Sequence, residues 1–171
     1  MNSSFHVPES YRRAMVDEAG PVPGSDAPVE DKLIFLQGNM VSFASQYNLP
    51  VIEVSLVVSK YLRILIESLE EHATLHHETI PEDLLRSRPL EAIPVTTILS
   101  DFPLETLIDK VDQDRMDIFD TILRTAINKT ELPFSPAISL LREWEGIVRA
   151  QLSRATGPGH LFSPVELPDG F

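Results

Sequence analysis

The chain has 171 residues, enough for one domain of ordinary size and too few for two. Its 26 acidic and 14 basic residues give a formal net charge of -12, and a surface of that sign repels phosphate backbones, so we expect no nucleic-acid binding. The absence of cysteine excludes disulfide scaffolds, thiolate metal sites and cysteine nucleophiles. No apolar run approaches the roughly 20 residues of a membrane span, and the N-terminus lacks a signal-peptide core, which predicts a cytoplasmic protein without membrane association.

Proline and glycine divide the chain into three parts. Residues 1–29 hold four prolines and no sustained apolar period, so we expect a flexible arm there. Residues 157–171 hold three prolines and three glycines and are expected to form an irregular tail. The intervening residues 30–156 form the folded domain, in which no internal repeat is apparent.

The first half of this domain has the period of helices. Residues 31–47 place apolar side chains on one face, and Pro50 lies just beyond the end of that pattern. Residues 51–78 form the strongest helical segment. Its β-branched opening could pass for a strand, but no turn separates that opening from the remainder of the segment, which favours a helix. Beyond the main stripe of this segment, further apolar residues widen the apolar surface: Ile52, Leu56, Ile64 and Ile66.

The second half is divided by proline. Pro81 opens one short helical turn, and residues 88–103 are expected to be an irregular connection. Helical periodicity returns over residues 104–129, and a last helix is predicted over 136–155, capped by Ser135. The sequence therefore predicts an all-α fold whose four main helices are arranged as in a four-helix bundle.

Two groups of acidic residues lie on two of the predicted helices. The first is Glu67, Glu70 and Glu71, at i, i+3 and i+4. The second spans residues 114–120 and contains an acid at every third position. Two such carboxylate pairs on facing helices would form an oxygen site suited to Mg²⁺ or Mn²⁺, whereas acidic groups on separate surfaces are typical of solvated helix faces. Spacing alone leaves both interpretations open.

Five segments occur in an order that points to a known family. They are residues 43–50 (FASQYNLP), 63–70 (RILIESLE), 114–119 (DRMDIF), 125–127 (TAI) and 149–157 (RAQLSRATG). In this order they resemble the MazG-like all-α nucleoside triphosphate pyrophosphohydrolases, which include the phosphoribosyl-ATP pyrophosphohydrolase-like proteins. The resemblance implies hydrolysis of a nucleoside triphosphate to the monophosphate and pyrophosphate, with Mg²⁺ or Mn²⁺ as cofactor.

The resemblance also assigns roles to individual residues. It implies metal ligands at Glu67, Glu70, Asp114 and Asp117. It implies that Glu70 or Glu71 orients or deprotonates the attacking water. The substrate-binding residues that go with these are Lys60, Arg63, Gln151 and Arg154.

The chain departs from the family pattern at several of these positions. Ile66 stands where the first glutamate of the metal motif is usual, and Asp114 stands where a longer glutamate is usual. Asp117 and Asp120 fit the second motif as well as Asp114 and Asp117 do, so two registers are open. The connection between the motifs is also longer than usual. These departures support an alternative, a non-catalytic helical oligomerisation or interaction protein that is a degenerate relative of the same fold.

Three further features complete the expectations. His72 and His76 have the spacing of a metal pair, but histidines near a helix C-terminus also complement its dipole, which we favour. Trp144 is expected in the core or at an interface. The breadth of the apolar surface on residues 51–69 predicts a homodimer or tetramer with this helix at its centre, and the resemblance implies the same.

Overall fold

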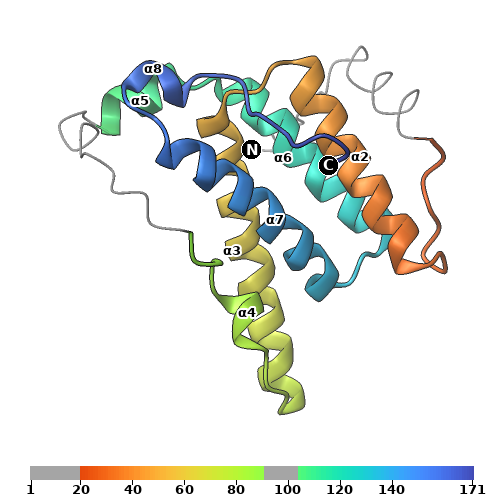
Figure 1. Ribbon diagram of the computed structural model, residues 1–171. Helices are drawn as coiled ribbons and strands as arrows, with labels where there is room; N and C mark the ends of the chain where they lie inside the picture. Colours follow the sequence, from red (N-terminus) through yellow and green to blue (C-terminus); the bar gives the residue numbers. More distant parts are fainter. Residues whose placement is uncertain (1–19, 91–103) are drawn as a thin grey trace, which may run out of the picture.

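The computed structural model describes residues 20–90 and 104–171 (Figure 1). Four long helices form the body, α2 (Val29–Gln46), α3 (Val51–His76), α6 (Gln113–Thr130) and α7 (Phe134–Ser153). Three short helices accompany them, α4 (Glu82–Leu85), α5 (Leu104–Lys110) and α8 (Pro158–Leu161). Within the described residues the only β-type pairing is an isolated bridge between Pro50 and Pro164. The prediction of an all-α fold with four main helices is confirmed.

Two helix boundaries differ from the sequence prediction. The segment expected as one helix over 104–129 is divided, because Asp112 is extended and its carboxylate accepts a hydrogen bond from the Arg115 backbone N–H at 3.0 Å, which caps a new helix. The last helix begins at Phe134, so Ser135 lies inside its first turn and is not the cap. Pro136 is tolerated there because N–H groups in a first turn have no intrahelical partner.

The four long helices form two hairpins of similar design. In the first hairpin (α2 and α3), Asn48 has φ 47° and Leu49 donates its N–H to the Ala44 carbonyl at 3.0 Å. In the second hairpin (α6 and α7), Glu131 has φ 52° and Leu132 makes the same bond to Ile127 at 3.1 Å. A left-handed residue with such a bond is a common helix end. In both turns a proline follows the buried leucine and precedes the next helix.

The hairpins also pack as equivalent halves. α2 packs on α6 and α3 packs on α7, while α3 also contacts α6 and α2 also contacts α7. This is the contact pattern of two hairpins related by an approximate two-fold rotation. Buried residues occupy equivalent positions in the two halves, as in the pairs Leu36 and Phe119, Met40 and Leu123, Val58 and Leu141, Tyr61 and Trp144, and Leu65 and Val148.

The expectation that the domain has no internal repeat is therefore wrong. The repeat is hidden in the sequence because the equivalent core positions share apolar character and seldom identity. Cores tolerate such exchanges when the pattern and total volume are kept. The turn repeats its Leu-Pro dipeptide, at 49–50 and again at 132–133.

Aromatic rings from both hairpins meet at the centre of the core. The rings of Phe43 and Phe119 stack with centroids 5.9 Å apart, and Phe119 lies 6.4 Å from Trp144. Trp144 is fully buried, and its indole N–H donates to the Gln37 side-chain oxygen at 2.7 Å. Trp144 thus lies in the core, one of the two places expected for it.

The C-terminal segment lies on the body. The Val51 N–H donates to the Ser163 carbonyl and the Val165 N–H donates to the Leu49 carbonyl, each at 2.8 Å. The Phe171 ring meets Trp144 edge-on at 5.2 Å. The tail expected to be irregular thus contains α8 and covers the first interhelical turn. Most of the expected N-terminal arm, residues 1–19, and most of the connection after residue 90 lie outside the described residues.

Candidate functional site

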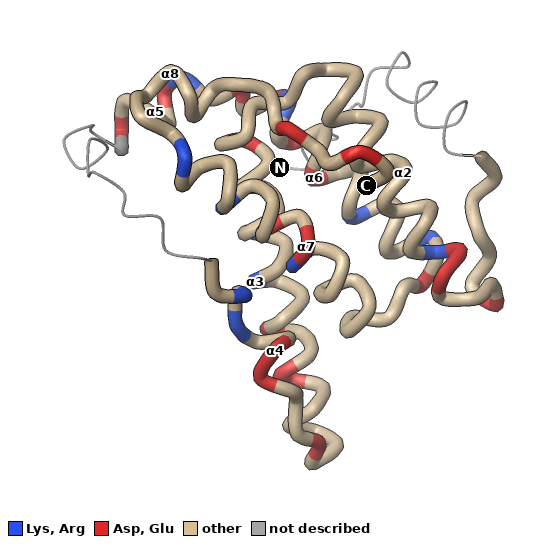
Figure 2. Tube along the Cα trace, viewed as in Figure 1, with Lys and Arg blue, Asp and Glu red and all other residues tan. Residues whose placement is uncertain are grey.

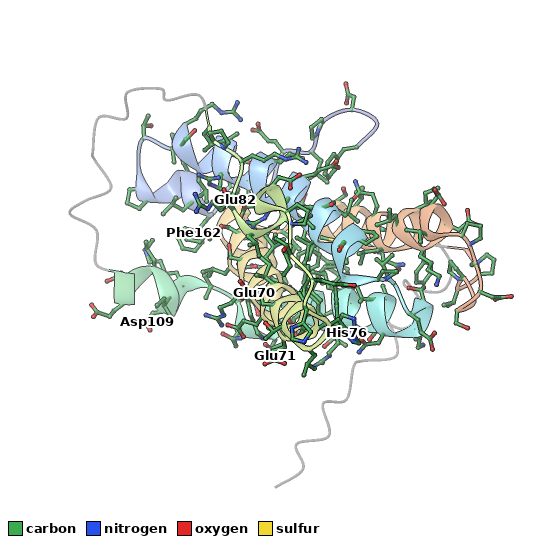
Figure 3. The ribbon with its side chains drawn as sticks, turned by 90° about the horizontal axis from the view of Figure 1, so that it is seen from below. Glu70, Glu71, His76, Glu82, Asp109 and Phe162 are labelled. Carbon is green, nitrogen blue, oxygen red and sulfur yellow. The ribbon has the colours of Figure 1, made fainter. Side chains whose placement is uncertain are left out.

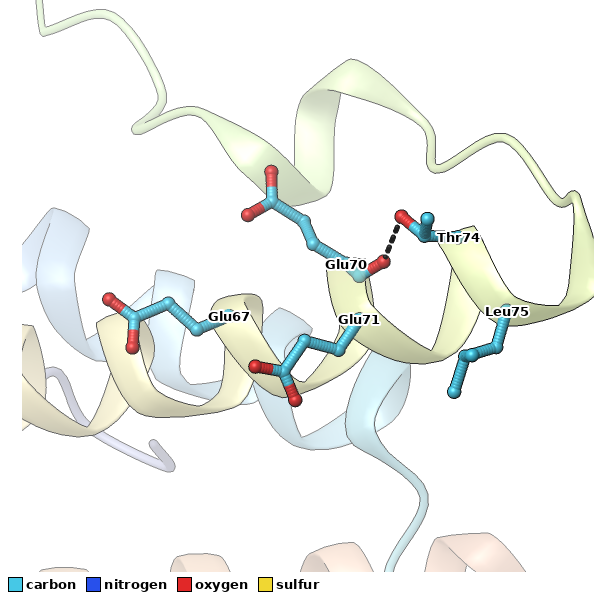
Figure 4. A pocket seen from close by; sticks show the side chains of 5 residues that line it. All are labelled: Glu67, Glu70, Glu71, Thr74 and Leu75. Carbon is cyan, nitrogen blue, oxygen red and sulfur yellow. Dashed lines mark hydrogen bonds between the residues drawn. The ribbon is translucent and has the colours of Figure 1, made fainter.

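The first acidic group lies on the half of α3 that extends beyond the other long helices (Figures 1 and 2). Glu67, Glu70 and Glu71 are all exposed to solvent. Together with Thr74 and Leu75 they line an open hollow of about 550 Å³ on the helix surface (Figure 4). In this view Glu70 and Glu71 point to opposite sides of the helix. The hollow is formed by one helix, and the described residues place no polar group of another helix in its lining.

The second acidic group lies at the start of α6. Asp114 is exposed, and Asp117 is half-buried and accepts a hydrogen bond from the Gln113 side-chain amide at 2.9 Å. The position of α6 against α3 is fixed by two ion pairs, Arg115 with Glu53 and Lys60 with Asp120. The two helices therefore run in the same direction.

This register separates the two acidic groups. Asp117 lies one turn before Asp120, whose neighbour on α3 is Lys60, so Asp117 is level with Leu56. Glu67 lies about 11 residues further along α3, which is about 16 Å at the helical rise. Oxygen ligands approach Mg²⁺ or Ca²⁺ to about 2–2.6 Å, so one ion cannot bind Glu67 and Asp117 of the same chain in this arrangement.

A metal-binding group of side chains is also absent from the remainder of the described chain. In residues 20–90 and 104–171, no group of three or more histidine and carboxylate side chains is arranged to hold a metal ion. His72 and His76, whose rings lie 4.4 Å apart, are exposed near the end of α3, and His76 lies in its last turn.

A buried carboxylate, Glu53, lies where α3 meets the start of α6, and the sequence analysis did not single it out. Glu53 is 1% exposed, and its two oxygens accept hydrogen bonds from the Arg115 guanidinium, both at 2.7 Å. Oxygen Oε1 also accepts from the Asp112 N–H at 2.9 Å. Glu53 thus binds α3 to the start of α6 and is fully used in structure. Its sequence signal was weak, since a single acid in a first helical turn is usually exposed.

A second polar group lies further along the contact of α3 with α6. The Lys60 ammonium is 3.6 Å from Asp120, and this carboxylate oxygen is buried without a hydrogen-bond partner. Tyr61, on the same turn, is 6% exposed. Burial, with a smaller contribution from Asp120, raises the pKa of the Tyr61 hydroxyl to about 12. A phenol of that pKa stays protonated at neutral pH and is not a general base there.

Two of the expected substrate-binding residues lie at the opposite end of the molecule. Gln151 and Arg154 line a hollow of about 360 Å³ between the end of α7 and the C-terminal segment. The Gln151 amide donates to the Pro164 carbonyl at 3.0 Å and accepts from the Glu166 N–H at 2.9 Å. Arg154 lies 3.9 Å from Glu166. Both side chains therefore hold the tail, and neither is near the acidic group on α3.

The other two expected substrate-binding residues, Lys60 and Arg63, share an exposed face of α3 with the acidic group. Six exposed residues of α3 follow one another at alternating spacings of four and three and therefore form a stripe along one side of the helix. We call this row the outward stripe of α3, and its members are Leu56, Lys60, Arg63, Glu67, Glu70 and Thr74. Leu56 and Ile64 are 42% and 39% exposed, which agrees with the apolar surface expected beside the main stripe. Ile66 instead packs partly against the core.

Comparison with known proteins identified no similar protein. The chain matches no protein-family model, no curated protein and no solved structure at a significant level. Among the described helices, none is both long and apolar enough to cross a membrane.

Proposed function

We propose that this protein is a helical interaction protein that acts by associating with itself through its helices rather than by catalysis. The observation that carries the proposal is the outward stripe of α3, whose six side chains are all exposed. Figure 3 shows Glu70 and Glu71 on the part of α3 that projects from the body. The buried polar groups support it as well. Glu53, Arg115 and Arg142 are each engaged in ion pairs and hydrogen bonds that bind helices or connections together.

The experiment is a measurement of mass in solution. Sedimentation equilibrium of the full chain over a range from micromolar to several hundred micromolar should give species larger than the 19.1 kDa chain. A single species of chain mass over the whole range would reject self-association. A calorimetric titration with Mg²⁺ and Mn²⁺, which should give no heat of specific binding, tests the non-catalytic part of the proposal.

A second candidate function is the metal-dependent nucleotide pyrophosphohydrolase that the family resemblance implies. The observation in its favour is that three carboxylates, Glu67, Glu70 and Glu71, line the same open hollow. Glu67 and Glu71, one helical turn apart, could bind Mg²⁺ through water molecules or together with the phosphate oxygens of a substrate, as this ion commonly requires. Glu70 points to the other side of the helix (Figure 4). This function does not need Asp114 and Asp117 to reach the same ion.

This candidate is tested by pyrophosphate release from a panel of nucleoside triphosphates and deoxynucleoside triphosphates with added Mg²⁺. Activity that requires the metal and is lost in Glu67→Gln would support it. A matched control is Glu143→Gln, which removes an exposed carboxylate from α7. Absence of release from every nucleotide, at enzyme concentrations up to micromolar, would leave the interaction function alone.

A further inference from the structure

The outward stripe of α3 has its charges in a particular order. Its first half carries the two bases, Lys60 and Arg63, and its second half carries the two acids, Glu67 and Glu70. Leu56 precedes the bases and Thr74 follows the acids. All six side chains are exposed. The Lys60 ammonium also lies 3.6 Å from Asp120 of α6, and 51% of the Lys60 side chain remains exposed.

This order is complementary to itself when the helix is reversed. If two copies of α3 lie antiparallel with the two-fold axis between Arg63 and Glu67, Lys60 faces Glu70 of the partner subunit and Arg63 faces Glu67 of the partner subunit. The symmetry repeats both pairs, which gives four attractive contacts. A parallel pair would instead place each charge against its own copy, and like charges repel.

The equivalent surface of the second hairpin has no such order. At the matching positions α7 carries Ser139, Glu143, Gly146 and Ala150. These side chains are small except for one exposed acid, and the neighbouring side of α7 is occupied by the segment that contains α4. Of two helices in equivalent positions, only α3 presents a long face with opposite charges in two separate blocks.

We propose that the outward stripe of α3 is the self-association surface and that it pairs antiparallel with the same stripe of a second copy. The proposal rests on the self-association proposed above and specifies its surface and direction. From Leu56 to Thr74 the contact is about 27 Å long. An interface one helix wide is small, so we expect a dissociation constant in the micromolar range or weaker.

Charge reversal tests the pairing. Lys60→Glu with Arg63→Glu makes the whole stripe acidic, and Glu67→Lys with Glu70→Lys makes it basic, so each double variant should dimerise about tenfold or more weakly than the natural chain. An equimolar mixture of the two should recover dimers. The variant with all four substitutions should also recover them, because it exchanges the two blocks and leaves the antiparallel pairing complementary.

Controls separate this effect from loss of folding. Glu143→Lys reverses an exposed charge at the matching position of α7 and should dimerise as the natural chain does. Because Lys60 also pairs with Asp120, Arg63→Glu alone provides a variant that leaves that contact in place. Far-ultraviolet circular dichroism and thermal unfolding should be close to those of the natural chain for Arg63→Glu.

A cysteine cross-link tests the direction. The chain has no cysteine, so introduced thiols have no competitor. In the antiparallel pair, Leu56→Cys should form a disulfide with Thr74→Cys when the two variants are mixed and oxidised. Neither variant should cross-link to itself, because two copies of position 56 lie about 27 Å apart.

The outcomes distinguish this inference from the function on which it rests. A monomeric natural chain rejects both. A stable dimer that tolerates the double reversals, or in which Leu56→Cys cross-links to itself, rejects the antiparallel α3 pairing and keeps self-association. Weakened double variants, recovery in the mixture and in the fourfold variant, and the mixed disulfide together would establish the pairing.

Discussion

The two helical hairpins share a design and differ in what they present to solvent. Each has an 18-residue first helix, a left-handed residue at its end, a buried leucine and a proline that precedes the second helix. Their second helices differ in length, with 26 residues in α3 and 20 in α7. The six additional residues of α3, 71–76, include the acidic residue Glu71. The shared part is therefore the core, and the difference lies in the exposed part of one helix.

The chain covers the two second helices differently. On α7, Arg142 donates to the Leu84 carbonyl at 3.1 Å and to both oxygens of Glu145 at 3.0 Å, and Arg149 donates to the Arg88 carbonyl at 2.9 Å. The bonds to the Leu84 and Arg88 carbonyls hold the segment after α3 against α7. The outward stripe of α3 has no comparable cover from the described residues. Of the two equivalent helices, α3 thus leaves the longer row of side chains exposed to solvent.

The largest expected effect concerns the ion pair that joins the hairpins. Arg115→Met removes the counter-charge of the buried Glu53 carboxylate and should lower the free energy of unfolding by about 3–5 kcal/mol. The matched control is Lys32→Met at the equivalent position of α2. Lys32 makes one hydrogen bond, to the Ser25 carbonyl at 2.7 Å, and its loss should cost about 1 kcal/mol. Equal losses in urea unfolding would show that Glu53 does not depend on Arg115.

The second prediction tests the equivalence of the two turns. Leu49 is 1% exposed and Leu132 is 4% exposed. Truncation of either to alanine leaves a cavity in the core and should cost about 2–4 kcal/mol. If the hairpins are equivalent, the two losses should agree to within about 1 kcal/mol in urea unfolding. A near-zero loss for one leucine would show that its turn is not packed as the other is.

The third prediction uses the aromatic pair at equivalent positions, Tyr61 and Trp144. The pKa of Tyr61 is raised to about 12 in the folded chain, from about 10 when unfolded. A raised folded pKa gives stability that is present below pH 10 and is lost as the pH rises from about 10 through 12, by at most about 3 kcal/mol. Tyr61→Phe should remove this part of the loss. Urea unfolding of the natural chain and of Tyr61→Phe between about pH 9 and 11 measures how the free energy of unfolding depends on pH. If this free energy falls equally in both proteins, the loss does not come from Tyr61.

The smallest expected effect is at the left-handed residues of the turns. Glu131 has φ 52°, a conformation that costs a residue with a Cβ about 1 kcal/mol, so Glu131→Gly should raise the melting temperature by about 3 °C. Asn48 has φ 47°, and asparagine adopts this conformation more readily, so Asn48→Gly should gain less. A melting temperature lowered by Glu131→Gly would show that the Glu131 side chain contributes more than its backbone conformation costs.

Local signals in the sequence were enough to predict the helices and their turns. Proline at positions 50 and 81 and the apolar period of 3.6 residues are such signals, because each acts within one or two turns of the chain. The exposed position of Glu67, Glu70 and Glu71 also follows from local spacing. The break at Asp112 was missed, since an aspartate that caps a helix and one that lies on its surface look alike in sequence.

How the helices meet was settled by tertiary contacts. The side-by-side position of α3 and α6 depends on contacts between residues about 60 positions apart, such as Glu53 with Arg115, and no local pattern encodes them. That position places the acidic groups about 16 Å apart along the helices, although their spacing within each helix suggested a shared metal site. The repeat of the two hairpins and the docking of the C-terminal segment on Leu49 and Val51 are likewise tertiary, because they depend on which apolar faces pack together.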